Sequence, residues 1–206
     1  MCQICPVLRA YFHKKRIEAG LDEAGRGCLA GPVFASAVIL PKNFHHPRLN
    51  DSKQVTEAVR LELRPIIEEH SLAWAVAMVD NEEIDRINIL RASFKAMHLA
   101  LDQLNLRPEV LLVDGNRFTP YQDLLHHCIV EGDATFASIA AASILAKTYR
   151  DDYMQELHKA HPEYGWDHNK AYATEFHRAA IVQYGLTRYH RRSFTCNPPQ
   201  GVLFGD

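Results

Sequence analysis

The sequence predicts an α/β protein with a mixed five-stranded sheet and helices on both faces. Three short apolar segments precede the longest early helical pattern and suggest an antiparallel meander, while two later segments suggest parallel additions. A sheet covered on both faces is the simplest packing that buries all the apolar stripes. The 206 residues, 47% hydrophobic and 23% charged, have the composition of an ordinary globular chain.

Each predicted strand is a short apolar run that stops at a turn signal. The first runs into the glycine-punctuated turn at 23–27, the second stops at Pro41, and the fourth ends at Asp114 and Gly115. The five predicted strands cover residues 17–22, 33–40, 72–79, 109–113 and 128–131.

The predicted helices carry apolar residues three and four positions apart. Thr56 is the expected N-cap of the first, and Pro108 follows the second. The predicted helices cover residues 56–69, 84–106, 134–160 and 171–184.

We expect a single domain over residues 1–206, with a flexible N-terminal extension over about 1–16 and a C-terminal helical region over about 160–195. The longest apolar runs are far shorter than the ~20 residues that span a bilayer. The N-terminal segment also lacks the pattern of a signal peptide. The sequence therefore predicts a cytosolic protein with no membrane partner.

The five cysteines are an odd number in a chain long enough for a proper core, so we do not expect a disulfide framework. Cys2 and Cys5 have the spacing of zinc ligands, but no second such pair exists. We interpret them as reduced thiols near the terminus, and their role stays open.

The net charge of −2 argues against a protein that coats nucleic acid by bulk attraction. A local basic groove is still compatible with it, because the field at a site depends on where the charges lie. Arg188, His190, Arg191 and Arg192 form such a basic cluster near the C-terminus.

Acidic residues follow the predicted strands. Asp22 and Glu23 close the first strand, Asp114 closes the fourth, and Asp133 follows the fifth. Strand ends are where sites form in open α/β sheets, so these four carboxylates could converge at one edge. Such a cluster holds either protons or cations, and oxygen ligands select Mg²⁺ or Mn²⁺. Two ions ~3.5–4 Å apart can drive phosphodiester hydrolysis.

Each of these acids also has an ordinary structural explanation. Asp133 is well placed to cap a helix, and Asp114 with Gly115 is a common turn pair. Asp22 and Glu23 could be solvated turn residues, and successive strand side chains point to opposite faces. Both could bind one metal site only if the backbone bends at Gly25.

The segment of residues 22–27, Asp-Glu-Ala-Gly-Arg-Gly, resembles a motif of the type 2 ribonuclease H family, and of bacterial ribonuclease HII in particular. The resemblance continues in order over about residues 17–195, nearly the whole chain. Its further motifs lie at residues 31–33, 50–53, 88–90, 113–117, 131–133, 139–147, 150–151, 164–165, 170–174, 177 and 190–194.

The resemblance implies a ribonuclease H-like fold and an enzyme that hydrolyses the RNA strand of RNA–DNA hybrids. It also implies nicking 5′ to single ribonucleotides in duplex DNA, with two Mg²⁺ or Mn²⁺ ions and with 3′-hydroxyl and 5′-phosphate ends. Its catalytic and metal-binding carboxylates match Asp22, Glu23, Asp114 and Asp133. Asp151 matches no catalytic position, and we interpret it as structural.

The same resemblance assigns substrate recognition to two segments. Gly25, Arg26 and Gly27 match the family loop that meets the ribonucleotide, where glycine lets the backbone approach a sugar and its 2′-hydroxyl. Tyr172 matches the tyrosine that packs on the deoxyribose following the ribonucleotide. Taken alone, a tyrosine in a helical pattern is more often a core residue.

Further substrate contacts are implied for basic and hydroxyl side chains. Phosphate contacts position a duplex without specifying its sequence. A solvated-surface role, or for the serines a helix or turn role, is the open alternative for each. The candidates are Ser52, Lys53, Arg117, Ser143, Lys147, Lys170, Arg191 and Arg192.

The chain departs from the family pattern around Tyr172. The family commonly has His-Lys-Gly-Tyr-Pro-Thr where residues 169–174 are Asn-Lys-Ala-Tyr-Ala-Thr. Losing glycine and proline alters the backbone that aims Tyr172, so the preference for the junction and the balance between the two substrates stay open. The preferred metal and the protein partners stay open as well.

Partner expectations are limited to nucleic acid. Residues 200–204, Gln-Gly-Val-Leu-Phe, lack the paired aromatics of a clamp-binding peptide, and we expect a monomer with an open groove. The alternatives are a silent binder of RNA–DNA hybrids and a small-molecule phosphatase. The complete carboxylate quartet argues against the first, and the lack of a phosphate-cradling P-loop argues against the second.

Overall fold

A mixed sheet of five strands forms the centre of the molecule, as the sequence predicts. A computed structural model describes residues 8–49 and 55–194. The strand order is β3-β2-β1-β4-β5. β1 pairs antiparallel with β2 and parallel with β4, β2 pairs antiparallel with β3, and β4 pairs parallel with β5. The strands are β1 (Glu18–Ala24), β2 (Val33–Ile39), β3 (Ala73–Val79), β4 (Val110–Asp114) and β5 (Leu125–Ile129).

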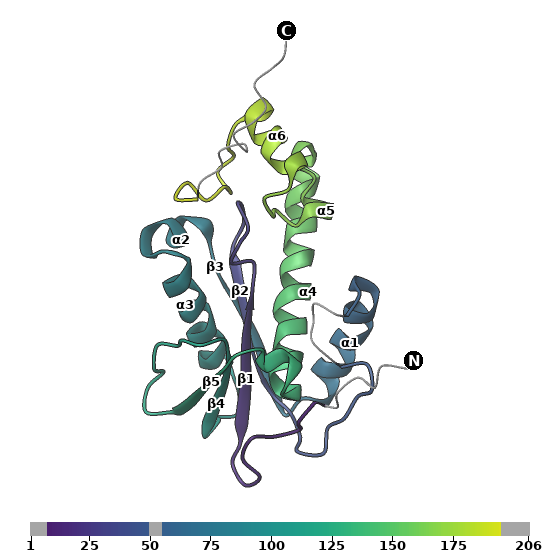
Figure 1. The fold of residues 1–206 in the computed structure, drawn as a ribbon, viewed down its shortest axis with the longest axis vertical. Coiled ribbons are helices and arrows are strands. Elements are labelled where there is room, and N and C mark those ends of the chain that lie inside the picture. Colours follow the sequence, from purple (N-terminus) through teal and green to yellow (C-terminus); the bar gives the residue numbers. More distant parts are fainter. Residues whose placement is uncertain (1–7, 50–54, 195–206) are drawn as a thin grey trace.

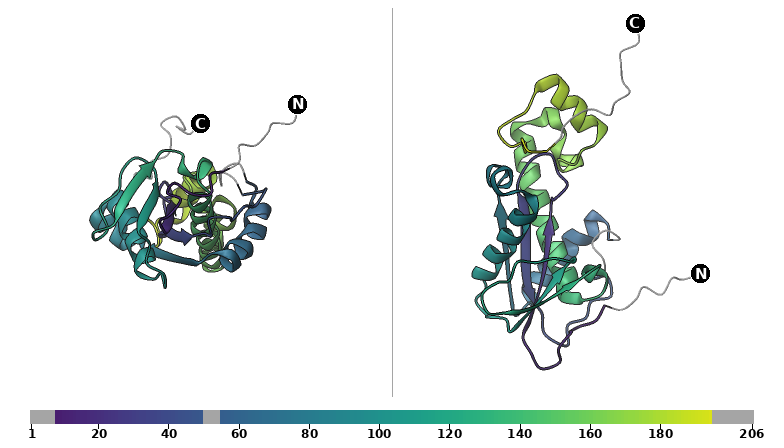
Figure 2. Two further views of the ribbon diagram at one scale, coloured as in Figure 1. Left: turned by 90° about the horizontal axis from the view of Figure 1, so that it is seen from below. Right: turned by 60° about the vertical axis from the view of Figure 1, so that its left-hand side comes forward.

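Helices cover both faces of this sheet (Figure 1). α3 packs on one face, and α1 and the long α4 pack on the other. The C-terminal segments gather at one end of the elongated molecule, around the end of α4 (Figure 2). The helices are α1 (Glu57–His70), α2 (Asn81–Ile87), α3 (Ile89–Asp102), α4 (Ala137–Ala160), α5 (Trp166–Asn169) and α6 (Glu175–Tyr184), with short 3₁₀ turns η1 (Gly132–Ala134) and η2 (Pro162–Tyr164).

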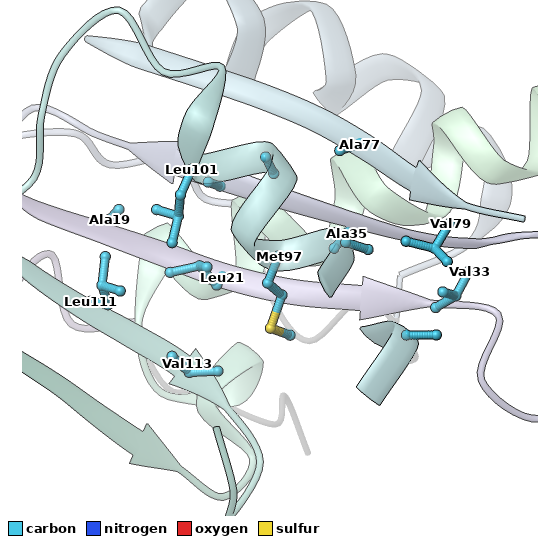
Figure 3. Close-up of a cluster of buried hydrophobic side chains, with 14 of the residues drawn as sticks. Ala19, Leu21, Val33, Ala35, Ala77, Val79, Met97, Leu101, Leu111 and Val113 are labelled. Carbon is cyan, nitrogen blue, oxygen red and sulfur yellow. The ribbon is translucent and has the colours of Figure 1, made fainter. Parts of the chain in front are cut away.

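Successive side chains of β1 point to opposite faces of the sheet. Ala19 and Leu21 point to one face, and α4 packs closely against the other. Ala19 and Leu21 are buried against Met97 and Leu101 of α3 (Figure 3). On the opposite face, a Cβ at Gly20 would lie 2.2 Å from the carbonyl carbon of Ser138. Only glycine lets α4 approach β1 this closely, and Asp22 follows two positions later on the same face.

The helical pattern predicted over 84–106 is two helices. Asn88 separates α2 from α3 with a φ of 68°, and its side chain accepts a hydrogen bond from the backbone N–H of Arg91 at 3.1 Å. Asparagine tolerates a positive φ and caps helices well, so one residue ends α2 and starts α3. α3 also ends at Asp102, short of the predicted boundary.

The C-terminal half also shifts the predicted boundaries. β5 covers Leu125–Ile129 rather than 128–131, and α4 starts at Ala137 rather than 134. Asp133 lies in η1, and the N-cap of α4 is Phe136, which makes no side-chain capping bond. The predicted helix over 171–184 begins only at Glu175, where Thr174 caps α6. α1 is capped by Thr56 as predicted.

Residues 9–13, part of the expected flexible N-terminal extension, make hydrogen bonds with the rest of the molecule. The N–H of Arg9 donates to Thr135 and the carbonyl of Arg9 accepts from Ala137, so the segment is bonded to the start of α4. The N–H of Phe12 donates to the buried carboxylate of Glu18. Cys2, Cys5 and residues 200–204 lie outside the described residues. No helix in the described part of the chain is long and apolar enough to cross a membrane.

Candidate active site

All four predicted carboxylates line one pocket of about 410 Å³. The pocket also contains six of the predicted substrate contacts: Ser143, Lys147, Tyr172 and, in the loop that follows β1, Gly25, Arg26 and Gly27. Its full lining is Asp22, Glu23, Ala24, Gly25, Arg26, Gly27, Asp114, Asp133, Ser143, Lys147 and Tyr172.

Parallel pairing of β1 with β4 brings the first three acids together. Leu21 is opposite Val113 in this register, so Asp22 and Asp114 stand at the same end of neighbouring strands. β1 continues to Ala24, so the prediction that it ends at Asp22 is wrong by two residues. Glu23 lines the same pocket although it is adjacent to Asp22, and the chain turns immediately afterwards at Gly25, with a φ of 93°.

Asp133 reaches the pocket through the tight turn after β5. The backbone N–H of Gly132 donates to Oδ1 of Asp114 at 2.8 Å, which ties this turn to the end of β4. A Cβ at Gly132 would lie 2.6 Å from Cδ1 of Ile139 on α4 and 3.2 Å from Oδ1 of Asp114, so a larger residue would crowd both side chains. Asp133 itself is buried, with 2% of its surface exposed.

Burial and charge repulsion act strongly on Asp22. The pKa of this carboxyl lies well above its usual value because the group is buried and lies near the charges of Glu23 and Asp114, against hydrogen bonds from Ser143 and from the N–H of Glu23. A cation in the pocket would relieve that repulsion. Nearby, the guanidinium of Arg26 already contacts the carboxylate of Glu23 at 3.0 Å.

The donor set fits a cation that is shared with a substrate. Within residues 8–49 and 55–194, no group of three or more His, Cys, Asp or Glu side chains could hold a metal ion as the side chains lie. Mg²⁺ is typically held by one or two carboxylates, with water and substrate phosphate oxygens completing its shell. The oxygen-only lining of this open pocket has that character.

The Gly25–Gly27 loop passes over a buried arginine. A Cβ at Gly25 would lie 2.1 Å from Nε of Arg150, so this position accepts only glycine, by space as well as by φ. Arg150 is 1% exposed and donates to the carbonyls of Pro32, Ala30 and Lys170 at 3.2, 3.2 and 2.9 Å. Its guanidinium therefore joins the chain after the loop to the segment before Tyr172.

Tyr172 stands at the rim of the pocket, with 43% of its surface exposed. Its phenol hydrogen-bonds the buried thiol of Cys28, and its ring lies 4.0 Å from where a Cβ of Gly27 would stand. The preceding Ala171 is fully buried with a φ of 65°, a conformation natural to the glycine that the family commonly has there.

A family model described as Ribonuclease HII matches residues 19–197. The chain belongs to the ribonuclease HII family. A Ribonuclease HII from Parabacteroides distasonis is 61% identical over 197 residues, covering 96% of this chain and 99% of that protein. A ribonuclease H2 structure from Pyrococcus horikoshii is 26% identical with a TM-score of 0.72, covering 87% of this chain and 94% of that one. The Bst-RNase HIII structure in complex with Mn²⁺ shares the fold at 20% identity and a TM-score of 0.59, covering 86% and 66%.

Family membership makes the chain a metal-dependent endonuclease with ribonuclease H activity on RNA–DNA hybrids. The fold expected from the resemblance is confirmed as well. The pocket is accordingly the candidate active site of a ribonuclease HII.

The predicted basic contacts lie in different surroundings. Lys147 lines the active-site pocket, and burial lowers the pKa of its ammonium group. Arg117 and Arg192 are exposed and lie outside the pocket lining. Lys170 lines a neighbouring pocket of about 240 Å³, where its ammonium donates to the carbonyl of Asp167 at 2.7 Å and lies 3.4 Å from Glu57. Ser52 and Lys53 lie outside the described residues.

The prediction that Arg191 contacts phosphate is wrong for its side chain as it lies. Arg191 is fully buried, and its guanidinium donates to the carbonyls of Gly31 and Arg26 at 3.0 and 2.9 Å. The side chain of Arg191 therefore supports the Gly25–Gly27 loop from inside the protein. Asp151, interpreted as structural, is buried beside the charges of Lys170, Lys147 and Arg150, and burial raises the pKa of its carboxyl.

Sequence reasoning missed Arg150, Cys28 and His177 as supports of the site. All three are fully or almost fully buried and bond to residues far away in the chain or in other segments. The one available signal was the position of Arg150 and His177 within motifs shared with the family.

Proposed function

We propose that this ribonuclease HII also nicks duplex DNA on the 5′ side of a single embedded ribonucleotide, with two divalent cations and with 3′-hydroxyl and 5′-phosphate products. The observation that supports it is the composition of one pocket. Four carboxylates, the Gly25–Gly27 loop and Tyr172 all line it. Groups suited to hydrolysis and groups suited to recognising a sugar thus face the same space.

Asp22, Glu23, Asp114 and Asp133 would hold the divalent cations together with the substrate phosphate. When bound, the cations activate water and neutralise charge on the phosphate and leaving oxygen. Mn²⁺, present in the Bst-RNase HIII structure, and Mg²⁺ both suit these oxygen ligands. Two features support this role: the β1–β4 register, which puts Asp22 and Asp114 at the same end of neighbouring strands, and the bond from Gly132 to Asp114.

Recognition would fall to the backbone of Gly25, Arg26 and Gly27 and to the ring of Tyr172. The loop backbone can hydrogen-bond the 2′-hydroxyl, which is the group that distinguishes RNA from DNA. The exposed face of Tyr172 can pack on the next sugar, where a second 2′-hydroxyl would interfere. Because Ala171 keeps a glycine-like φ, the change from the family sequence leaves the tyrosine at the pocket rim.

Phosphate contacts are proposed for the basic side chains that remain accessible, which are Lys147 at the pocket and Arg117 and Arg192 on the surface. A further phosphate contact is proposed for Ser143. Lys170 would act from the adjoining pocket. We further propose that the enzyme works as a single-domain monomer.

The test uses three end-labelled duplexes of one sequence: DNA with a single ribonucleotide, a continuous RNA–DNA hybrid, and all-DNA as the matched control. With Mg²⁺ or Mn²⁺ we expect one nick 5′ to the ribonucleotide, cleavage of the hybrid, and no cleavage of the control. A chelator should abolish both reactions. Cleavage of the hybrid alone would remove the proposed junction activity and leave the hybrid-cleaving enzyme.

A further inference from the structure

The backbone carbonyl of Tyr172 accepts a hydrogen bond from a buried histidine. Nδ1 of His177 lies 3.0 Å from this oxygen, and His177 is fully buried in the first turn of α6. A carbonyl oxygen can only accept, so the proton of this imidazole is on Nδ1. Its Nε2 is therefore an acceptor, and it receives the indole N–H of Trp166 at 3.1 Å.

A second buried histidine extends this chain of bonds. Nδ1 of His190 accepts the backbone N–H of Thr187 at 2.9 Å, so the proton of His190 is on Nε2. That nitrogen lies 3.3 Å from Nε2 of His177, whose single lone pair it shares with the indole N–H of Trp166. His190 thus donates to His177, and His177 donates to Tyr172, so the partners fix both tautomers.

Both imidazoles stay neutral in this environment. Burial lowers the pKa of His177, and burial together with the repulsion that a protonated His177 would exert lowers the pKa of His190 to about 4. The rings of Tyr164 and Trp166 enclose His190, with centroids 5.0 and 5.5 Å from it. Protonating either ring would place two donors against each other.

The backbone links the same segments a second time. The N–H of Leu29 donates to Ala171, and the carbonyl of Leu29 accepts from Arg191, both at 2.8 Å. The strand-like stretch that follows the Gly25–Gly27 loop therefore lies between the Tyr172 segment (residues 169–174) and His190 with Arg191. A shift of either histidine would move Tyr172 relative to the loop that it faces.

We propose that His177 and His190 are positioning residues that hold Tyr172 against the Gly25–Gly27 loop and so set the preference for a ribonucleotide–DNA junction over a continuous hybrid. This inference rests on the proposed junction activity. Neither histidine lines the active-site pocket, and both act through the backbone of Tyr172.

Asparagine and glutamine substitutions test the two tautomers separately. The amide nitrogen of Asn is as many bonds from Cβ as Nδ1 of histidine, and that of Gln as many as Nε2. His177→Asn keeps the donor to Tyr172, and His177→Gln removes it. At His190 the order reverses, because His190→Gln keeps the donor to His177 and His190→Asn removes it.

The quantity to measure is the ratio of kcat/KM for the single-ribonucleotide duplex to kcat/KM for the hybrid. We expect this ratio to fall about tenfold in His177→Gln, the effect of one lost neutral hydrogen bond. It should fall by less in His190→Asn, because Trp166 still donates to His177, and stay near wild type in His177→Asn and His190→Gln. Tyr172→Ala gives the ratio without the tyrosine. If the histidines only filled space, the same substitution, Asn or Gln, would be the better tolerated at both positions, or kcat/KM would fall equally on both substrates. Either result would overturn the inference.

A spectroscopic measurement on the wild-type enzyme tests the two tautomers without relying on the folding of any variant. Nitrogen-15 spectra of labelled histidine should show one neutral ring protonated on Nδ1 and coupled through Nε2 to a second ring protonated on Nε2. Two Nε2-protonated rings would overturn the inference. A wild-type enzyme that does not nick the lone ribonucleotide would remove both the proposed function and this inference, whereas nicking with unchanged ratios in the variants would remove the inference alone.

Discussion

The two halves of the active site are held in different ways. Asp22 and Asp114 stand on regular structure, because the parallel ladder of β1 and β4 puts them at the same end of neighbouring strands. The Tyr172 segment (residues 169–174) has no ladder of that length. A backbone bond from Leu29 to Ala171 joins it to the rest of the fold, and side-chain donors hold it from Arg150 to the carbonyl of Lys170 and from His177 to the carbonyl of Tyr172.

This difference separates the chemistry from the recognition. The carboxylate end tolerates little variation, because each acid depends on strand register and on glycines at positions 20 and 132 that α4 crowds. The Tyr172 segment can change its sequence, as Ala171 shows, provided that its backbone partners remain. Hydrolysis should therefore depend on single carboxylates, and substrate preference on the bonds behind Tyr172.

Asp22→Asn should have the largest effect, on the carboxylate half. We expect the cleavage rate on either duplex to fall about 10³-fold, because a buried charge that would hold cations is removed. Without metal, the free energy of unfolding should rise, since the raised pKa of Asp22 shows that its ionised form is disfavoured in the folded protein. Steady-state cleavage and urea unfolding measure the two quantities.

The matched control for that variant is Asp123→Asn, which changes an acid whose side chain is 82% exposed and outside the pocket lining. It should leave the cleavage rate within twofold of wild type, because an exposed charge outside the pocket contributes almost nothing. Near-wild-type cleavage by Asp22→Asn would contradict the assignment of the carboxylate pocket as the active site.

Arg150→Met tests the other half. Its guanidinium donates to three carbonyls in a buried site, so the substitution should lower the free energy of unfolding by about 3 kcal/mol, near 1 kcal/mol for each unsatisfied group. Arg86→Met is the control, since that side chain is 70% exposed in a local pair with Glu83 and should change stability little. Equal urea midpoints for the two variants would show that Arg150 does not join the segments.

The same contrast explains what the sequence could predict. The mixed five-stranded sheet follows from apolar runs separated by turns and helices, and the four acids follow from their places at strand ends, whereas the strand order was not predicted. The break at Asn88 was hidden because apolar residues continue on both sides of it with helical spacing. The burial of Arg191 was hidden because its partners, Gly31 and Arg26, are about 160 residues away in the chain.

The histidine pair should give the Tyr172 segment a pH-dependent stability. The pKa of His190 is about 4 in the folded protein against an ordinary 6.5, and that of His177 is lowered too. Between these values the unfolded chain binds a proton that the folded chain does not, so the free energy of unfolding should fall as pH drops from 6.5 toward 4. Urea unfolding at pH 7, 6 and 5 measures this slope.

Raised pKa values at Asp22 and Asp151 act in the opposite direction over part of that range, so the comparison is between variants. His190→Gln lacks the titrating group and should show a shallower fall than the wild type over the same three pH values. Parallel curves for the two proteins would mean that His190 does not titrate with unfolding.

Ala171→Gly should have the smallest effect, and its smallness is informative. Removing a buried methyl costs about 0.8 kcal/mol and the added backbone freedom costs up to about 1 kcal/mol. Relief of an alanine held at a φ of 65° returns about 1–2 kcal/mol, so the net change in the free energy of unfolding should stay within about 1 kcal/mol. Ala140→Gly, at a fully buried position inside α4, has no such relief and should cost about 2 kcal/mol. Equal losses in the two variants would mean that Ala171 is not strained, and the bonds around the Tyr172 segment would then have no unfavourable backbone conformation to offset.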